Sequence, residues 1–323
     1  MALFGTFRKR GTLLRNFLYD WRRFSGNSFV FKARTRENRR AMIHILAHSL
    51  EHGMALSEPR EGYGQQKANS LIGKVETYLA DYGPDASTDW ALAVLGTYCG
   101  FHADRAHALP ELERRLEKLN SAQSAAGTKG GVFELTKEQI AAATQIDYER
   151  FVQARHSVRQ YADRPVSSGL IERAVRNAQC APSVCNRQTC RVYALTDKKA
   201  IAEALAYQSG NAGFGHELGA LFVITANMEH LNLVGERYQG WIDGGIFAMS
   251  LLLALHAEGL GTCCLNWSTE MERDQALRRH LAIPDEELVI TMMGAGHLKD
   301  RFSVPVSKRK PLDSVLVMKH PGP

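Results

Sequence analysis

The hydrophobic positions in the first 33 residues follow the spacing of a helix. Positions 7, 14, 17, 18 and 21 are Phe, Leu, Phe, Leu and Trp, which share one helical face, and basic residues occupy the opposite face. A helix of this kind could lie on an anionic membrane surface or dock on a partner. The alternative is that the stripe packs against the protein's own body, and we favour this alternative slightly.

Residues 36–120 predict further helices with polar joints. The apolar spacing indicates helices over residues 39–56, 65–82, 89–101 and 109–119. Small and polar residues then fill positions 120–131, which is typical of a linker. We therefore predict a helical N-terminal extension over residues 1–120, a linker over 121–135 and a second domain over 136–323. Thr136, with Gln139 three residues later, predicts the start of the first helix of that domain.

The pattern changes to alternating elements after residue 155. Strand-like runs lie at residues 191–195, 220–225 and 288–293, and helical runs lie at residues 170–178, 198–206, 243–258 and 271–281. This alternation predicts an α+β or α/β domain. We find no internal repeat.

Charge and cysteine content narrow the class of protein. Residues 1–40 hold eleven Lys or Arg against two acidic residues, a net charge of +9, so the remainder of this +6 chain is at −3. We expect no nucleic-acid partner, because the basic charge belongs to one segment. Six cysteines in 323 residues predict reduced cytosolic thiols rather than a disulfide framework. No apolar run approaches the roughly 18 residues of a membrane span, and no export signal is recognised, so we predict a cytoplasmic protein, with membrane association at the inner face as a further option.

Two loops carry the candidate chemistry. The first, Arg155-His156-Ser157-Val158-Arg159, groups two guanidiniums and a hydroxyl, which are suited to holding a phosphate. The second, residues 181–188, is a Pro-containing loop with amide side chains that could hydrogen-bond the edge of a flat heterocycle. We expect the helix over residues 170–178, which lies between the two loops, to bring both loops to the same end of a helix. A segment suited to a phosphate and a loop suited to the polar edge of a ring together indicate a flavin mononucleotide (FMN) site.

Residues 150–319 resemble the nitroreductase-like FMN-dependent oxidoreductases. Four motifs occur in the family's order: the Arg-His-Ser-x-Arg segment, the Ala-Pro-Ser-x-x-Asn-x-Gln loop, residues 259–265 (Gly-Leu-Gly-Thr-Cys-Cys-Leu) and residues 308–312 (Lys-Arg-Lys-Pro-Leu). The resemblance implies an α+β fold with an antiparallel-sheet core flanked by helices. The helical N-terminal region is a departure from the family pattern.

The resemblance also implies which residues hold the cofactor. The residues expected at the phosphate and ribityl chain are Arg155, His156, Ser157 and Arg159, with Lys308 and Arg309 returning to the phosphate. The residues expected at the edge of the isoalloxazine ring are Pro182, Ser183, Asn186 and Gln188, and those expected against the ring near N5 are Gly261, Thr262, Leu265 and Asn266.

The activity implied by the resemblance is hydride transfer from NAD(P)H through flavin N5 to an electron-poor small-molecule acceptor. No protein nucleophile is required, so no catalytic residue is named. Family members are typically homodimers with flavin at the subunit interface, and the apolar helix over residues 243–258 is the expected dimer-core element. Two alternatives stay open: a flavin-binding scaffold without turnover, and a flavin-consuming or dehydrogenating branch of the family.

The N-terminal extension is similar to extensions on family members linked with cell-surface polysaccharide production. It could cover the flavin and define a substrate pocket, or dock the enzyme on a membrane or partner. His44, His48 and His52 share one helix face, but their order is not that of a usual metal motif, and we predict no metal site. Gly294-x-Gly296 follows a strand but lacks the rest of a dinucleotide-binding motif.

Overall fold

Side-chain caps set where the helices of the N-terminal extension begin. In the computed structural model, which describes residues 2–120 and 127–319 with side chains from residue 8 onward, Thr35 and Asn38 form a reciprocal capping box at the start of α2 (Arg36–Met54). Asp85 caps α4 (Ala86–Ala103) by accepting the backbone N–H groups of residues 87 and 88.

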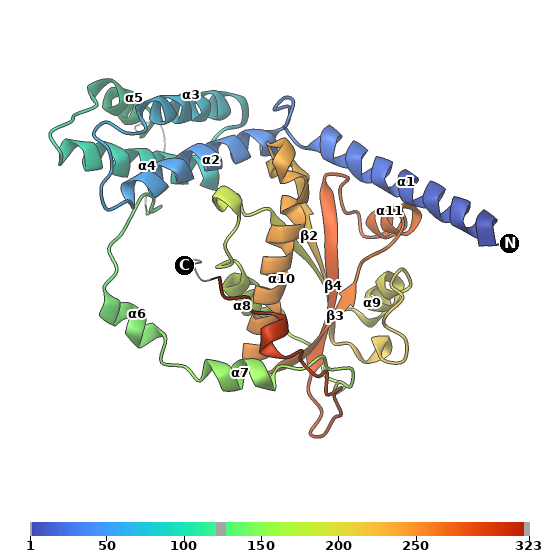
Figure 1. Ribbon diagram of the computed structural model, residues 1–323. Helices are drawn as coiled ribbons and strands as arrows, with labels where there is room; N and C mark the ends of the chain where they lie inside the picture. The colour runs from blue at the N-terminus through green and yellow to red at the C-terminus, as the bar shows by residue number, and fades with distance from the viewer. Residues whose placement is uncertain (1, 121–126, 320–323) are drawn as a thin grey trace.

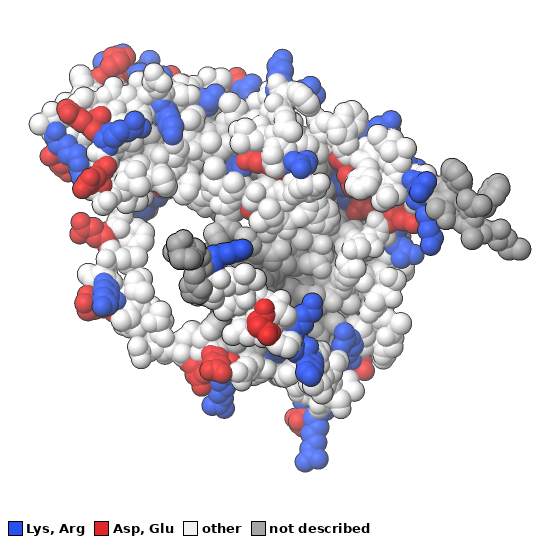
Figure 2. Space-filling view, viewed as in Figure 1, with Lys and Arg blue, Asp and Glu red and all other residues white. Residues whose placement is uncertain are grey.

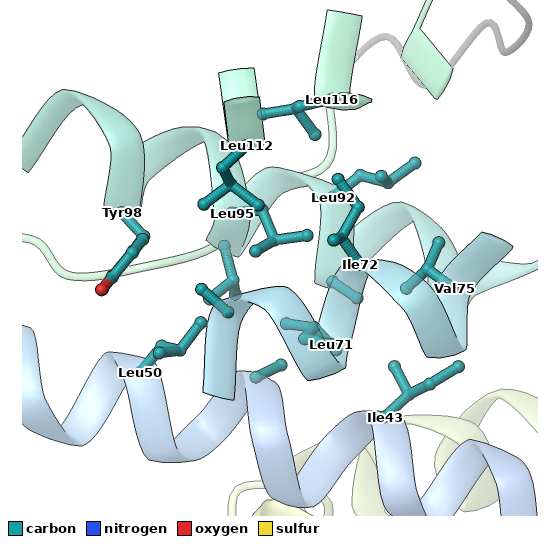
Figure 3. Close-up of a cluster of buried hydrophobic side chains, with 14 of the residues drawn as sticks. Ile43, Leu50, Leu71, Ile72, Val75, Leu92, Leu95, Tyr98, Leu112 and Leu116 are labelled. Atoms are coloured by element: carbon teal, nitrogen blue, oxygen red, sulfur yellow. The ribbon is translucent and has the colours of Figure 1, made fainter. Parts of the chain in front are cut away.

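The extension has a hydrophobic core of its own. α2 packs against α4 and against α3 (Gln65–Tyr82), and α5 (Pro110–Asn120) closes the bundle. The apolar side chains of these four helices point toward one another (Figure 3) and are buried, among them Ile43, Leu50, Leu71, Ile72, Val75, Leu92, Leu95, Leu112 and Leu116. The predicted helical character of the extension is therefore confirmed, and its helices α2–α5 form a packed bundle.

The second part of the chain is built on a four-stranded sheet. The strand order is β1 (Cys190–Leu195), β2 (Ala220–Asn227), β4 (Glu287–His297) and β3 (Leu260–Asn266), and every neighbouring pair is antiparallel. β2 is buried along its whole length, which is consistent with its apolar run over residues 220–224. The predicted antiparallel α+β core is confirmed.

Helices cover both faces of this sheet (Figure 1). α8 (Ser168–Ala178) and α10 (Gln239–Ala257) pack together on one face. α9 (Lys198–Leu205) and α11 (Met271–His280) contribute buried side chains to the core on the other face. Short 3-10 helices complete the domain, namely η1 (Val184–Asn186), η2 (Gly215–Glu217), η3 (Met228–His230), η4 (Val234–Tyr238) and η5 (Leu312–Ser314).

α10 requires a correction to the expectation that no segment could span a membrane. The helical stretch 234–257, which joins η4 to α10, has 24 residues and a mean hydropathy of 1.4, enough by length and composition. Its inner face packs on the sheet and on α8, as in the core helix of a soluble domain. It is not buried on all sides, because Trp241, Ile242, Ile246 and Met249 are exposed on its outer face.

α1 (Ala2–Asn27) does not join the helical bundle. It lies along the edge of the second domain beside α11 and ends at the periphery of the molecule (Figure 1). The alternative we favoured, in which its apolar stripe packs on the protein's own body, is wrong for the described part of the helix. Phe17 and Trp21 remain 62% and 63% exposed.

The segment that joins the bundle to the second domain forms an arch. α6 (Lys137–Ala143) and α7 (Tyr148–Ala154) have no buried residue, and the space-filling view shows an opening between this arch and the body (Figure 2). Thr136 and Gln139 form the predicted capping box. Apolar side chains lie exposed along the arch, including Phe133, Leu135, Ile140 and Ile146.

Candidate functional site

The phosphate-binding segment predicted at residues 155–159 runs along the edge of the sheet. The N–H of Val158 donates to the carbonyl of Thr262 (2.9 Å), and Ser157 pairs with Thr262 as a parallel bridge. Val158 is buried, whereas its neighbour Ser157 is half-buried and Arg159 is exposed, as expected for an extended segment with one face on the core. The first and third predicted motifs therefore lie side by side.

The cations of this segment are available to an anion. Within the described residues, neither Arg155 nor Arg159 forms an ion pair with a carboxylate, and His156 is exposed. The Arg159 guanidinium lies 5.8 Å from the centre of the Phe214 ring, a distance typical of a cation–π contact. Such a contact orients the side chain without neutralising it.

β3 contributes backbone and close packing at this place. A Cβ on Gly261 would lie 3.0 Å from Val158, so the glycine allows residues 155–159 to approach the strand. Thr262 is buried, and Leu265 belongs to the hydrophobic core, whereas Asn266 is exposed. Leu265 thus has only its backbone free to face a ligand. Cys263 is buried and Cys264 exposed, the opposite orientations that adjacent strand residues require.

The loop predicted to border the flavin ring has an unusual backbone. Cys185, Asn186 and Gln188 all have positive φ, between 49° and 51°, a region sparsely populated by residues with a Cβ. The N–H of Gln188 donates to Ser183 Oγ (2.9 Å), which closes the loop on itself. Such strained loops persist only where surrounding structure holds them. Pro182 is exposed at the start of the loop.

A buried arginine inside the loop supplies that support, and sequence reasoning missed it. The side chain of Arg187 is fully buried and pairs with Glu236 (2.5 Å), while its Nε donates to the carbonyl of Val184 (3.1 Å). Burial alone would raise the pKa of Glu236, but hydrogen bonds led by the one from Arg187 lower it. Asp243, at the start of α10, accepts a long hydrogen bond from the N–H of Val184 (3.4 Å). The contacts of Arg187 and Asp243 therefore hold the loop in this conformation.

The helical extension contacts the same loop. His44 of α2 lies 3.2 Å, through Nδ1, from the carbonyl oxygen of Asn186, and 3.0 Å, through Nε2, from Ser87 Oγ. His230 bridges the loop and the extension, because its ring nitrogens reach the carbonyl of Arg187 (3.0 Å) and Glu37 (3.3 Å). Local sequence could not show that the extension contacts the ring-binding loop, because the contacting residues lie about 140 positions apart.

Burial affects the protonation of His44. Burial lowers the pKa of this imidazole, and the hydrogen bond that its Nδ1 donates to the Asn186 carbonyl opposes the shift only in part. Neutral His44 is therefore favoured in the folded protein. His48 pairs instead with Glu51 (3.3 Å), so the three histidines of α2 do not converge on one point. Among the described residues, no group of three His, Cys, Asp or Glu side chains could hold a metal ion.

The two predicted loops do not lie at the same end of a helix, and that expectation is wrong. The ring of His256, near the end of α10, contacts the carbonyl of Phe151 just before the phosphate-binding segment, whereas Asp243, near its start, contacts the ring-binding loop. Thirteen residues of helix separate these contacts, or about 20 Å at 1.5 Å per residue. A helix separates the loops that precede and follow it, as α8 does here.

The late basic residues lie on an exposed C-terminal segment. This segment leaves β4 through a bridge between Leu298 and Tyr161, and the N–H of Ser303 donates to Gln160 Oε1 (3.1 Å). It thus starts beside the phosphate-binding segment. Lys308 and Arg309 are exposed farther along, and Arg309 Nη1 donates to the carbonyl of Ser307 (2.6 Å). Among the described residues, no hydrogen bond or ion pair joins Lys308 or Arg309 to Arg155.

A small cavity adjoins the ring-binding loop. It has a volume of about 80 Å³ and is lined by residues that include Pro182, Ser183, Gln188 and Phe247. Typical ligand sites occupy about 300–1,000 Å³. This cavity is therefore smaller than a typical ligand site. A larger cavity of about 810 Å³ lies elsewhere, between α1 and the body.

Comparisons with known proteins match the part of the chain that holds these segments. The model of the nitroreductase family matches residues 152–297, which contain the phosphate-binding segment, the ring-binding loop and the whole sheet. A protein of Archaeoglobus fulgidus named "Putative NADH dehydrogenase/NAD(P)H nitroreductase" is 30% identical over 155 residues, which cover 47% of this chain and 85% of that protein. A 4-nitrobenzoate reductase of Pseudomonas putida is 23% identical and covers 49% of this chain and 88% of its own length.

A solved structure, that of an FMN-dependent nitroreductase from Clostridium difficile, is also similar. It is 22% identical, covers 53% of this chain and 98% of its own, and has a TM-score of 0.45. On the family match and the Archaeoglobus relative, the chain belongs to the nitroreductase family. It is an oxidoreductase of that family with a helical extension in front of the shared domain.

Proposed function

We propose that the protein is an FMN-dependent oxidoreductase that takes hydride from NAD(P)H and passes it to an electron-poor small molecule. The observation that carries the proposal is the pairing of Ser157 with Thr262, which sets Arg155 and Arg159 against β3 within the family domain. Two guanidiniums without carboxylate partners, beside a hydroxyl, are a suitable donor set for a dianionic phosphate.

The chain's own residues would bind and orient the cofactor. Arg155, Ser157 and Arg159 would hold the phosphate end, and the amides of Asn186 and Gln188 would present hydrogen-bonding groups to the ring edge. Bound FMN would supply the hydride-transfer chemistry. The link to polysaccharide production stays a prediction, and the hydride donor is either NADH or NADPH.

We propose a homodimer in which each site draws on both chains. Phe151, four residues before Arg155, and the ring-binding loop contact opposite ends of α10, so the loop of one chain would complete the phosphate end of the other. The outer face of α10, with Trp241, Ile242, Ile246 and Met249 exposed, supports an interface there. The exposed apolar residues of the arch also support a contact between the arch and the partner chain. We propose a cytoplasmic location on the basis of the six unpaired cysteines.

Flavin content tests the proposal. The purified protein should carry FMN or rebind it stoichiometrically, as measured by flavin absorbance after release. Arg155→Ala combined with Arg159→Ala should lower FMN affinity by at least a hundredfold, because two charge-assisted contacts are lost. Arg150→Ala with Arg176→Ala is a matched control, since both residues are exposed helix arginines outside the motif, and it should leave affinity unchanged. A wild-type protein that neither carries nor rebinds FMN would overturn the proposal.

A further inference from the structure

α1 contacts the protein through its polar face. Asn16 Oδ1 accepts the N–H of Met271 (2.8 Å), and the Tyr19 hydroxyl donates to Asp274 (2.7 Å). One turn later the buried guanidinium of Arg23 donates to two backbone carbonyls next to β4 (2.9 and 2.6 Å). The positions 16, 19 and 23 follow helical spacing, so they form one continuous face. This polar face holds the helix against the domain.

The apolar face of α1 points the other way. Leu14, Phe17, Leu18 and Trp21 are 61%, 62%, 44% and 63% exposed. At 100° per residue these four positions lie about half a turn from the polar face. An ordinary surface helix buries its apolar face, whereas α1 packs on the domain through its polar face and exposes its apolar face. Four large apolar side chains in one stripe are an unusual solvent-facing surface for a soluble protein.

Positive charge lies at both ends of the stripe. Arg10 and Arg22 are exposed, and neither of them is paired with a carboxylate in the part of the chain that the structure describes. Arg10 stands one turn before Leu14, and Arg22 one turn after Leu18, so cations flank the apolar residues. Apolar residues bordered by arginines are the composition of helices that lie in the interface of anionic membranes.

We propose that α1 lies flat on an anionic lipid surface, with Leu14, Phe17, Leu18 and Trp21 among the acyl chains and the flanking cations at the lipid phosphates. The place of the helix suits this role, because α1 forms one edge of the molecule, away from the arch (Figure 1). The polar contacts of Tyr19 and Arg23 would keep the enzyme attached to the helix.

Charge also argues against a second copy of the chain as the occupant. A symmetric pairing of two α1 stripes would bring Arg10 and Arg22 of one copy against the same residues of the other. Like charges in an interface with few acids nearby are unfavourable, whereas anionic lipid phosphates neutralise them. The proposal does not depend on the flavin chemistry.

Vesicle flotation tests this inference with the full-length protein. Vesicles of phosphatidylcholine with about one third phosphatidylglycerol should carry the protein, and vesicles of phosphatidylcholine alone should carry much less of it. Phe17→Glu with Trp21→Glu should reduce binding at least tenfold. Arg10→Gln with Arg22→Gln should reduce it roughly tenfold as well, since each cation near the surface contributes to binding. Added salt should weaken binding of the wild type.

Matched controls separate membrane binding from general effects. Leu56→Glu with Leu233→Glu places the same new charges at residues that are 50% and 58% exposed but lie outside α1, and it should leave binding unchanged. Thermal unfolding checks that every variant is folded. Two results would overturn the inference: a wild-type protein that stays unbound with anionic vesicles, or an α1 variant that binds as well as the wild type. A change of molar mass in the α1 variant, with binding intact, would assign the stripe to a second copy instead.

Discussion

Asn186, Arg187 and Gln188 illustrate what can be learned from single residues. The motif singles out the first and third as ligands, and the structure leaves both side chains outside the core. Arg187, between them, turns inward and is fully buried. Local sequence does not reveal this, because an arginine is rarely fully buried unless it is paired, and its partner is distant in the sequence. The ion pair with Glu236 is a contact between residues 49 positions apart.

Loss of Arg187 should destabilise the protein and loosen the ring-binding loop. Arg187→Met leaves Glu236 buried without its partner, so we expect the free energy of unfolding to fall by about 3 kcal/mol. Urea denaturation measures this change, with the exposed Arg176→Met as a control. Adding Glu236→Gln should recover part of the loss, because no unpaired charge is then buried. Equal stability of Arg187→Met and wild type would contradict the role of the pair.

His44 should make the stability of the extension depend on pH. Burial depresses its pKa in the folded protein, so the unfolded chain binds the extra proton more readily. The stabilising contribution is therefore present above the ordinary histidine pKa of about 6.5 and is lost as pH falls through the folded value. Thermal unfolding between pH 7.5 and 5 should show a steeper decline for wild type than for His44→Gln. The exposed His52→Gln should decline like wild type, and identical slopes for all three proteins would refute the assignment.

Secondary-structure elements were predicted well where a cap or a periodic apolar face marks them. α3 occupies residues 65–82 as predicted, and the predicted strands correspond to β1, β2 and β4. β3 was absent from the predicted strands, because its residues (Leu-Gly-Thr-Cys-Cys-Leu-Asn) have neither alternating polarity nor many β-branched side chains. The direction of the α1 stripe was also missed. An amphipathic pattern gives two faces and does not say which one meets the protein.

The start of α4 should be sensitive to Asp85. One carboxylate oxygen caps the helix, and the other accepts hydrogen bonds from Tyr78 (2.6 Å) and Arg40 (2.7 Å). Asp85→Ala should lower the free energy of unfolding of the bundle by about 2 kcal/mol, since cap and ion pair are both lost. Asp85→Asn should cost less, because an asparagine oxygen still caps. Chemical denaturation followed by circular dichroism measures both, and a neutral Asp85→Ala would contradict this role.

At the scale of the whole molecule, the sequence predicted the parts better than their relation. The extension, the antiparallel sheet and the family could all be predicted, because they depend on local periodicity and on short motifs. The contact of His44 with the ring-binding loop and the separation of that loop from Arg155 could not, because tertiary packing determines both. Arg309 lies on an exposed segment, and its predicted place at the phosphate awaits a test with the assembled protein.

Mixed dimers test whether each site uses two chains. One chain would carry Arg155→Ala with Arg159→Ala, and the other Asn186→Ala with Gln188→Ala. If the sites are shared, each mixed dimer has one site free of all four substitutions and should bind about one FMN tightly. Homodimers of either variant should bind weakly. Differently tagged chains allow the mixed dimer to be purified and its flavin counted. Mixed dimers that bind no better than either homodimer would show that each site belongs to one chain.

Anaerobic reduction of the FMN-loaded protein tests the central claim most directly. Mixing with NADH or NADPH in a stopped-flow instrument should bleach the oxidised flavin absorbance, and an electron-poor acceptor such as a quinone or nitroaromatic should then restore it. The Arg155→Ala, Arg159→Ala protein should show much smaller changes of protein-bound flavin, because it binds FMN weakly. Protein-bound flavin that stays oxidised with both nicotinamides would contradict the proposed oxidoreductase and favour a flavin-binding protein without turnover.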